Sequence, residues 1–389
     1  MRNDDLRQMI AGTGRPNAAA PLRIIHVIHR PAGDILRHVA DLVEAQHKAG
    51  NHVGLLCDTG EGDGSEAEAF ARLDPMLALG LIRAPMRREI TNFRAALALA
   101  DRVRILDPDV LHGHGAKGGA YARTIGTRLR ASGSRVSRIY TPHGGRLHSS
   151  RRLALSWERT LARFTDAFIF VSEYERDLFF AKIAHTTRPV AVAYNGLRPD
   201  DFAPVIPATA ARDFAFIGDL RNVKGADLFI GAIALIGHRT GKAPTAAIVG
   251  TGPEEQKYRA VVTGLGLADD IEFHTARPAR DAMTLARTVV VPSRVETMPY
   301  IVLDAVAAGM PLVATNVGGV AEIFGNDAER LVPPNDVTAL ADAMSSVLAA
   351  PGAALAKAAA LNIRIRAIFT VEAMAATVDS IYRALTPQH

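Results

Sequence analysis

The segment "TVVVPSRVETMPYIVLDAVAAGMPLVATNVGG" (residues 288–319) predicts a strand, a loop, a helix and a second strand, in that order. The run "TVVV" has the short apolar composition of a buried strand, and "YIVLDAVAAG" has an alanine-rich helical pattern that ends at a glycine. "PLVAT" then predicts a strand parallel to the first, because a helical crossover joins parallel strands. The segment therefore indicates a parallel sheet covered by helices.

The same alternation of short apolar strands with helices runs through the rest of the chain. It is interrupted at "RPDDFAPVIPATAARD" (residues 198–213), where three prolines predict an interdomain connection. We expect an α/β protein with two doubly wound, Rossmann-like parallel-sheet domains facing each other across a cleft, where such sheets bind their ligands. The expected units are a loose N-terminal tail (residues 1–20), the two domains (21–205 and 206–368) and a final amphipathic helix (369–389).

Composition narrows the class of protein. The chain has 389 residues, of which 48% are hydrophobic, and this is enough for two cores. No apolar run approaches the roughly 18 residues of a membrane span, and residues 1–20 lack the apolar core of a secretory signal. The one cysteine, Cys57, excludes an internal disulfide, and its surroundings "VGLLCD" predict a buried strand residue. These features predict a cytoplasmic protein.

Positive charge is concentrated in the first half of the chain. Residues 1–205 contain 29 of the 45 Lys and Arg residues and 22 of the 40 Asp and Glu residues. No basic stretch is interleaved with aromatic residues, so we do not expect nucleic acid as a partner. The basic half instead predicts peripheral contact with an anionic membrane surface.

Two carboxylates flank the start of the helix in the opening segment. Glu296 lies in the loop before it, and Asp304 lies about 7–8 Å further along the helix. Pro299 suits the first helical turn, and the free amides of Thr297 and Met298 form an anion site there. Acids beside an anion site suit a ligand with both hydroxyls and phosphate, such as a sugar nucleotide. The structural alternative is that Glu296 caps amides and Asp304 pairs with an arginine.

A second loop at a strand's carboxyl end carries cations. In "GDLRNVKG" (residues 218–225), Arg221 and Lys224 stand three residues apart and are suited to neutralise a diphosphate without a metal ion. In "RPAGDI", Gly33 follows the first strand, where the backbone could approach a phosphate closely. The full G-x-G-x-x-G fingerprint is lacking, so dinucleotide binding is not expected.

Histidines mark two further strand ends. "HGHG" places His112 and His114 at alternate positions of a strand end, and we expect one to point into the core and His114 into the cleft. His143 in "TPHGG" ends another strand. No third ligand stands at metal spacing in the sequence, so we expect no zinc and no metal cofactor.

Taken together, these motifs resemble retaining glycosyltransferase family four, which has the GT-B fold. The resemblance rests on Glu296 and Asp304 with seven residues between them, followed by "AVAAGMPLVATNVGGVAEI", and on "GDLRNVKG", "AYNGL" and "IIHVIHRPAGDILRHVADL". Asp304 stands where the family has a second glutamate. Asp219 stands where the family's diphosphate loop has an arginine, so Arg221 would take that role.

The resemblance implies roles for the residues of the cleft. Glu296 would hold the hydroxyls of the donor sugar, Asp304 the ribose, and Arg221 and Lys224 the leaving diphosphate. His114 would approach the sugar near the reacting carbon. The remaining substrate-binding residues would be Gly33, His143, Thr297, Met298, Pro299 and, beside the base, Arg277. The last helix would return to pack on the first domain.

We therefore expect a retaining, metal-independent hexosyltransferase. It would use a nucleotide-diphosphate sugar as donor and act on a glycan or lipid-linked acceptor in surface polysaccharide or lipopolysaccharide synthesis. One alternative is a sugar-nucleotide 2-epimerase on the same fold, which should show more acid–base carboxylates in its amino-terminal loops. The other is a non-catalytic sugar-nucleotide-binding protein, which measurement of donor hydrolysis would distinguish.

Overall fold

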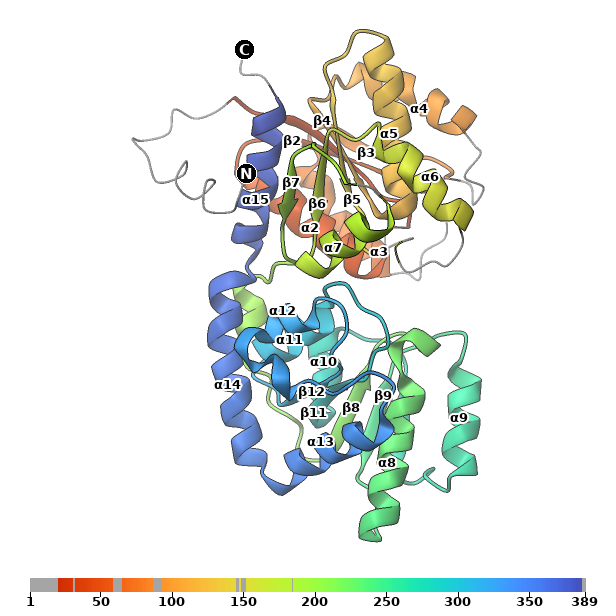
Figure 1. The fold of residues 1–389 in the computed structure, drawn as a ribbon. Helices are drawn as coiled ribbons and strands as arrows, with labels where there is room; N and C mark the ends of the chain where they lie inside the picture. The colour runs from red at the N-terminus through yellow and green to blue at the C-terminus, as the bar shows by residue number, and fades with distance from the viewer. Residues whose placement is uncertain are drawn as a thin grey trace.

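The computed structural model describes residues 20–30, 32–58, 65–86, 93–144, 147, 152–183 and 185–386. They form two α/β domains, which Figure 1 shows one above the other. The first contains a parallel sheet in the order β3-β2-β1-β4-β5-β6-β7, and the second a parallel sheet in the order β10-β9-β8-β11-β12. The expected fold class is therefore confirmed.

The strands of the first sheet are short and mostly buried, as in parallel sheets covered on both faces. They are β1 (Arg23–Val27), β2 (His52–Cys57), β3 (Gly80–Arg83), β4 (Val110–His114), β5 (Ser137–Thr141), β6 (Ala167–Phe170) and β7 (Val190–Val192). The helices between them are α2 (Gly33–Lys48), α3 (Ser65–Leu73), α4 (Phe93–Ile105), α5 (Gly115–Ala131), α6 (Arg152–Ala162) and α7 (Glu173–Lys182). Cys57 is fully buried in β2, as predicted.

The second domain repeats the scheme with fewer strands. These are β8 (Arg212–Ile217), β9 (Ala246–Val249), β10 (Ile271–His274), β11 (Ala286–Val291) and β12 (Leu312–Ala314). Its helices are α8 (Ala226–Thr240), α9 (Glu255–Gly264), α10 (Ala279–Met283), α11 (Tyr300–Ala307), α12 (Val320–Phe324), α13 (Val337–Ala349) and α14 (Pro351–Ile368). The segment at residues 288–319 forms β11, α11 and β12, and β11 pairs with both β8 and β12.

The last helix, α15 (Val371–Leu385), belongs to the core of the first domain. Figure 1 shows α14 along the second domain and α15 beside the first. Val378 and Tyr382 of α15 are fully buried in the cluster that contains Ile24 of β1. The chain thus crosses between the domains twice, and the crossings are joined where Leu197 N–H donates to the Phe369 carbonyl at 2.9 Å and Val371 N–H to the Leu197 carbonyl at 3.0 Å.

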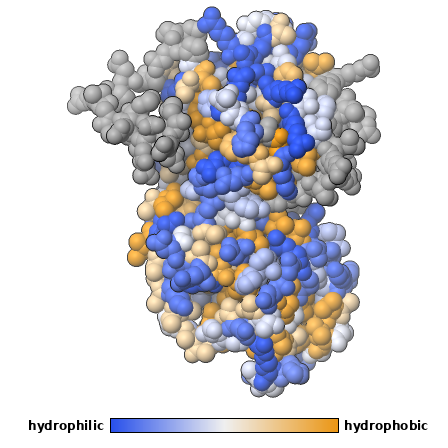
Figure 2. Space-filling model, viewed as in Figure 1, coloured by the Kyte–Doolittle hydropathy of each residue, from blue (hydrophilic) through white to orange (hydrophobic). Residues whose placement is uncertain are grey.

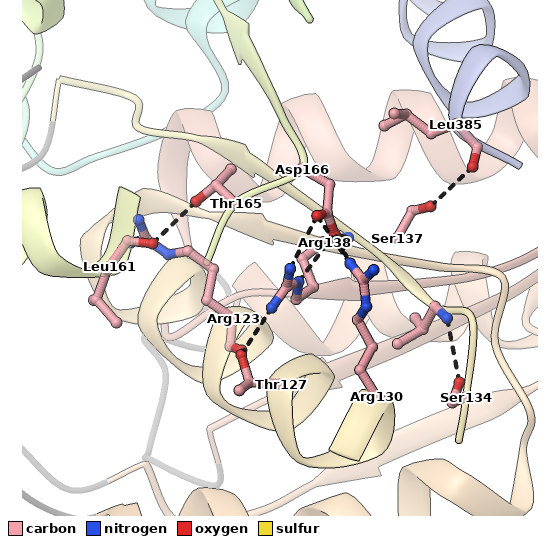
Figure 3. A network of polar contacts seen from close by, with 11 residues as sticks. Arg123, Thr127, Arg130, Ser134, Ser137, Arg138, Leu161, Thr165, Asp166 and Leu385 are labelled. Carbon is pink, nitrogen blue, oxygen red and sulfur yellow. Dashed lines mark hydrogen bonds and ion pairs between the residues drawn. The ribbon is translucent and has the colours of Figure 1, made fainter. Parts of the chain in front are cut away.

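An arginine–aspartate network fastens α5 to the first sheet (Figure 3). Arg138 of β5 donates from Nε and Nη2 to the Asp166 carboxylate at 2.9 Å, and Arg130 of α5 donates to the same group. Arg138 also donates to the Thr127 hydroxyl of α5 at 3.0 Å. Burial would raise the pKa of Asp166, but the hydrogen bonds from Arg138 outweigh it and the pKa is lowered. Asp166 therefore remains a charged anchor at the start of β6.

Figure 2 shows polar and apolar side chains interspersed over the viewed face of both domains. Among the described helices, none alone is both long and apolar enough to cross a membrane. Helices α13 and α14 reach that length and composition only as a pair, and they are bent by 104°.

Candidate active site between the domains

A cleft of about 310 Å³ lies where the carboxyl ends of β8 and β11 face the start of α2. The residues that line it include Gly33, Asp34, Ile35, Gly218, Asp219, Lys224, Ser293, Glu296, Pro299 and Ile301. A larger cavity of about 640 Å³, beside Asp213, Arg287 and Pro311, lies at the opposite, amino ends of the strands. Because parallel sheets bind ligands at their carboxyl ends, the smaller cleft with converging charges is the candidate site.

An ion pair stands at the centre of this cleft. Lys224 Nζ lies 2.6 Å from Glu296 Oε1, and the Ser293 hydroxyl donates to the same oxygen at 2.8 Å. Desolvation would lower the pKa of Lys224, but the Glu296 carboxylate outweighs it and the pKa is raised. Lys224 therefore brings a full positive charge into the cleft. Glu296 Oε2 takes part in no hydrogen bond with the described residues, which leaves it available to a ligand.

The Lys224 loop is held against the Glu296 loop by close backbone contact. Gly225 has φ 77°, and a Cβ there would lie 2.1 Å from the Pro292 carbonyl oxygen, so only glycine fits. Arg294 N–H donates to the Val223 carbonyl at 2.8 Å, and the Arg294 guanidinium donates to Asp227 at 2.7 and 2.8 Å. These contacts fix the distance between the lysine and the glutamate.

The double glycine Gly318–Gly319 packs against the backbone of the loop that carries Glu296. Gly318 has φ 58°, and a Cβ there would lie 1.8 Å from the Glu296 carbonyl oxygen. A Cβ on Gly319 would lie 2.2 Å from the Thr297 carbonyl oxygen, which accepts a hydrogen bond from Gly319 N–H at 2.8 Å. The two glycines therefore allow the backbone after β12 to pack directly on the backbone that carries Glu296.

Asp304 is directed away from the lining of the cleft. Its Oδ2 accepts a hydrogen bond from Arg37 Nη1 at 2.7 Å, and Arg37 Nη2 donates to Asp201 at 3.1 Å. The Arg37 guanidinium also lies 4.2 Å from the centre of the Tyr300 ring. Burial would lower the pKa of Arg37, but Asp304 outweighs it and the pKa is raised. Asp304 is therefore one half of an ion pair between the domains, and its predicted contact with ribose stays a prediction.

The histidines lie elsewhere than the strand pattern predicted. Both His112 and His114 are buried, with exposed fractions of 0% and 1%, and neither is among the residues that line the cleft. The physical reason is that residues two positions apart in a strand point to the same face, and the rings of His112 and His114 accordingly lie side by side with centres 4.0 Å apart. His26 of β1, His38 of α2 and the half-buried His143 surround them, so the fold brings together imidazoles that stand at no metal spacing in the sequence.

A chain of hydrogen bonds joins three of these rings. His26 Nε2 lies 2.8 Å from Gln46 Oε1, His26 Nδ1 lies 3.0 Å from His114 Nε2, and His114 Nδ1 lies 3.1 Å from His143 Nε2. Burial lowers the pKa of His26 to about 4 and the pKa values of His114 and His143 well below the usual range. These imidazoles are therefore neutral near pH 7. The predicted approach of His114 to a donor sugar stays a prediction.

The remaining predicted residues fall into two groups. Gly33, with φ 62°, and Pro299 line the cleft beside Lys224 and Glu296. Met298 is buried, and its carbonyl accepts a hydrogen bond from Asn195 Nδ2 at 2.7 Å, while Thr297 is half-buried beside it. Arg221, which lies 3.7 Å from Asp219, and Arg277 on the loop after β10 are exposed and outside the lining of the cleft.

Sequence reasoning missed Asp34 as a lining residue. It follows Gly33 in the first turn of α2, on the wall opposite Lys224, and is exposed to the cleft. Its carboxylate is among the groups that raise the pKa of Lys224. The available signal was its position directly after a strand's carboxyl end. It gives the cleft a second carboxylate, supplied by the other domain.

Comparison with known proteins agrees with this architecture. The family Glycosyltransferase Family 4 matches residues 35–201, and the family Glycosyl transferases group 1 matches residues 211–350. The two matches cover one domain each. The cleft therefore lies between the two matched segments.

Individual relatives point the same way. The chain is 29% identical over 267 residues to a glycogen synthase of Mycobacterium tuberculosis, covering 64% of this chain and 63% of that protein. It is also 29% identical over 258 residues to the lipopolysaccharide core biosynthesis mannosyltransferase LpsB of Rhizobium meliloti, covering 61% of this chain and 71% of that protein. The structure of Anabaena Alr3699/HepE in complex with UDP superposes with a TM-score of 0.74 at 16% identity, covering 94% of this chain and 100% of that one. The predicted resemblance to a glycosyltransferase is confirmed: the chain belongs to the glycosyltransferases, with a Glycosyltransferase Family 4 match in its first domain, a Glycosyl transferases group 1 match in its second and the GT-B fold, while the retaining mode and the Glu296–Asp304 signature stay predictions.

Proposed function

We propose that this protein transfers a hexose-type sugar from a nucleoside-diphosphate sugar to a glycan or lipid-linked acceptor, with retention at the anomeric carbon and without a metal ion. The observation that carries the proposal is the Lys224–Glu296 pair in the interdomain cleft, 2.6 Å apart. A lysine beside a glutamate with one free oxygen offers a cation for diphosphate and an acceptor for sugar hydroxyls. The family match and the polysaccharide roles named for the relatives support the same chemistry.

The reaction proceeds in one step in this proposal. The bond between the anomeric carbon and the diphosphate oxygen breaks, and its electron pair leaves with the diphosphate. The acceptor hydroxyl oxygen bonds to the anomeric carbon from the same face and passes its proton to the departing phosphate oxygen. Lys224 stabilises the charge that develops on that oxygen, and the amide dipoles at the start of α11 add to this effect. The charge of Lys224 replaces that of a metal ion.

The other cleft carboxylate gives the competing route. Double displacement would require a carboxylate to attack the anomeric carbon, and Asp34 is the carboxylate on the opposite wall. Glu296 is held by Lys224 and Ser293, which favours hydroxyl binding over nucleophilic attack. Mass spectrometry of the protein with a 2-fluoro donor sugar distinguishes the routes. A glycosylated Asp34 would refute the one-step mechanism.

The test is a thermal-shift and turnover panel with UDP, GDP, ADP and their hexose conjugates, carried out in EDTA. We expect one nucleotide diphosphate to stabilise the wild-type protein, and Lys224→Ala to lose that stabilisation. Lys242→Ala is the matched control, because Lys242 is exposed at the end of α8 that lies away from the cleft. Release of nucleotide diphosphate with sugar transfer supports the proposal, a C2 epimer of the sugar would indicate an epimerase, and binding without turnover would indicate a binding protein.

We further propose that the basic first domain brings the protein to the cytoplasmic face of an anionic membrane. Residues 1–205 contain seven more basic than acidic residues, 29 against 22. Such a surface gains roughly 1 kcal/mol for each Lys or Arg that reaches an anionic lipid layer. Flotation with phosphatidylglycerol liposomes should show association that falls as salt is raised. Equal flotation with neutral liposomes would refute an electrostatic mechanism.

A further inference from the structure

The first domain contains two sets of three imidazoles whose nitrogens lie within 4.8 Å of one another. One set is His26, His112 and His114, and the other is His38, His114 and His143. His112 already uses both nitrogens, at 2.6 Å from the Tyr382 hydroxyl and 2.8 Å from the Thr141 hydroxyl. The second set is different, because its member His143 is only half-buried and gives a route from solvent.

His38 presents an unused lone pair to this second set. Asn195 Nδ2 donates to the Met298 carbonyl at 2.7 Å, which turns Asn195 Oδ1 toward His38 Nδ1 at 3.0 Å. His38 Nδ1 must therefore carry the hydrogen, and Nε2 carries the lone pair. Nε2 is buried and has no hydrogen-bond partner among the described residues. Buried polar atoms normally have a partner, so an unpaired one points to a missing ligand.

The other two rings are already spaced as metal ligands. His114 Nδ1 and His143 Nε2 lie 3.1 Å apart. Two nitrogens bound to one zinc ion at 2.0–2.1 Å stand about 3.1–3.4 Å from each other in near-tetrahedral geometry. One nitrogen from each of His38, His114 and His143 lies within 4.8 Å of the other two, so the three side chains need to close by at most about 1.4 Å to reach the spacing of a zinc site.

Outer contacts orient two of the rings as in established metal sites. A metal-bound histidine commonly donates its second ring N–H to a fixed acceptor. His38 Nδ1–H donates to Asn195 Oδ1. His114 Nε2–H donates to His26 Nδ1, because His26 Nε2 in turn donates to Gln46 Oε1. The backbone of His143 has φ 51°, an uncommon conformation for a residue with a side chain and one that recurs at ligand sites.

We propose that His38 Nε2, His114 Nδ1 and His143 Nε2 bind a zinc ion, with the fourth position open toward the exposed side of His143. The ion replaces the hydrogen that His143 Nε2 shares with His114 Nδ1, and that hydrogen moves to Nδ1 of His143. No bond to carbon changes and no electron is transferred. Three neutral imidazoles favour zinc over magnesium, which prefers oxygen ligands. The site contains neither Lys224 nor Glu296, but it shares His114 and His143 with the residues to which the resemblance assigns the substrate, so zinc bound here would compete with that role.

The test is isothermal titration of the EDTA-stripped, full-length protein with zinc chloride alone, with metal content checked by elemental analysis. We expect one zinc per chain, no heat with magnesium chloride, and a rise in Kd of at least about 100-fold in His143→Ala. His143 is the variant of choice because its side chain is only half-buried. His238→Ala, an exposed histidine on α8, is the control and should leave the Kd unchanged.

Cobalt substitution gives a readout that does not depend on the variants. Visible absorption bands typical of tetrahedral cobalt, lost on addition of zinc, would support the site. Absence of zinc binding by the wild-type protein would overturn the proposal. Zinc binding that His143→Ala leaves unchanged, while circular dichroism shows the variant folded, would also overturn it.

Discussion

Replacement of Gly318 by alanine should displace the loop that carries Glu296 and so weaken ligand binding in the cleft. Gly318 does not touch the cleft, but its backbone lies under the carbonyl of Glu296. A methyl group there would lie 1.8 Å from that oxygen, against the roughly 3.2 Å that a carbon–oxygen contact tolerates. The Glu296 loop must therefore move by more than about 1 Å, which is enough to break the 2.6 Å contact with Lys224.

The loss of unfolding free energy in Gly318→Ala has two parts, and a second glycine of the same chain allows them to be measured separately. Alanine in the left-handed region costs about 1–2 kcal/mol, since Gly318 has φ 58°. Displacement of packed backbone costs about 1–3 kcal/mol more. Gly309 has φ 73° and nothing within 4 Å of a built Cβ, so Gly309→Ala carries the first part without the second. We expect a loss of about 2–5 kcal/mol for Gly318→Ala and about 1–2 kcal/mol for Gly309→Ala.

Urea unfolding and nucleotide titration together measure both effects. The free energy of unfolding gives the cost, and the Kd for the nucleotide diphosphate that the panel identifies gives the damage to the cleft. We expect Gly318→Ala to weaken binding by at least tenfold, about 1.4 kcal/mol, and Gly309→Ala to leave it unchanged. Equal effects of the two variants on both quantities would refute the reasoning, because the contact with Glu296 would then carry no energy.

Three further predictions concern charged side chains. Glu158→Ala should lower the free energy of unfolding in urea by about 3–5 kcal/mol, because it leaves the fully buried Arg123, now 2.7 Å from Glu158, without its carboxylate; a loss below 1 kcal/mol would contradict this. Burial raises the pKa of Glu175 to about 7 from its usual 4.5. Between pH 4.5 and pH 7 the folded state therefore binds a proton that the unfolded state does not bind. Wild-type stability relative to Glu175→Gln should therefore fall by up to about 3 kcal/mol as pH rises from 4.5 to 7, and a pH-independent difference would show that the group does not titrate there. Asp304→Asn should weaken the binding of UDP and of inorganic diphosphate by the same factor, because Asp304 accepts a hydrogen bond from Arg37. A loss of affinity confined to UDP would instead favour the ribose contact implied by the family.

The parts of the structure that follow from sequence are those set by neighbours along the chain. Apolar runs of four to six residues between helical segments predict the parallel strands, and the prolines at residues 198–213 mark the change of domain. Lys224 and Glu296 follow β8 and β11, which pair directly in the sheet. Two loops at the same ends of paired strands must lie close together, so this contact was within reach of sequence reasoning.

The parts that did not follow depend on which distant surfaces meet. Asp304 is 267 positions from its partner Arg37, and no local pattern shows that α2 will present an arginine to α11. His114 was expected in the cleft because strand alternation assigns faces but does not show what covers them. Here His26 and His38 cover it, from elements that come earlier in the chain. His112 and His114 are two positions apart and therefore share one face of β4, so strand alternation could not separate them.

The place of α15 affects the order in which the protein can be made. The strands of the first domain leave the ribosome before the second domain, yet Val378 and Tyr382, both fully buried in the first domain's core, are translated after it. Until they arrive, Ile24 and its neighbours expose an apolar face, and His112 lacks its contact with the Tyr382 hydroxyl. The second domain can therefore complete its core before the first, and the nascent chain must keep an open hydrophobic groove while the second domain is being synthesised.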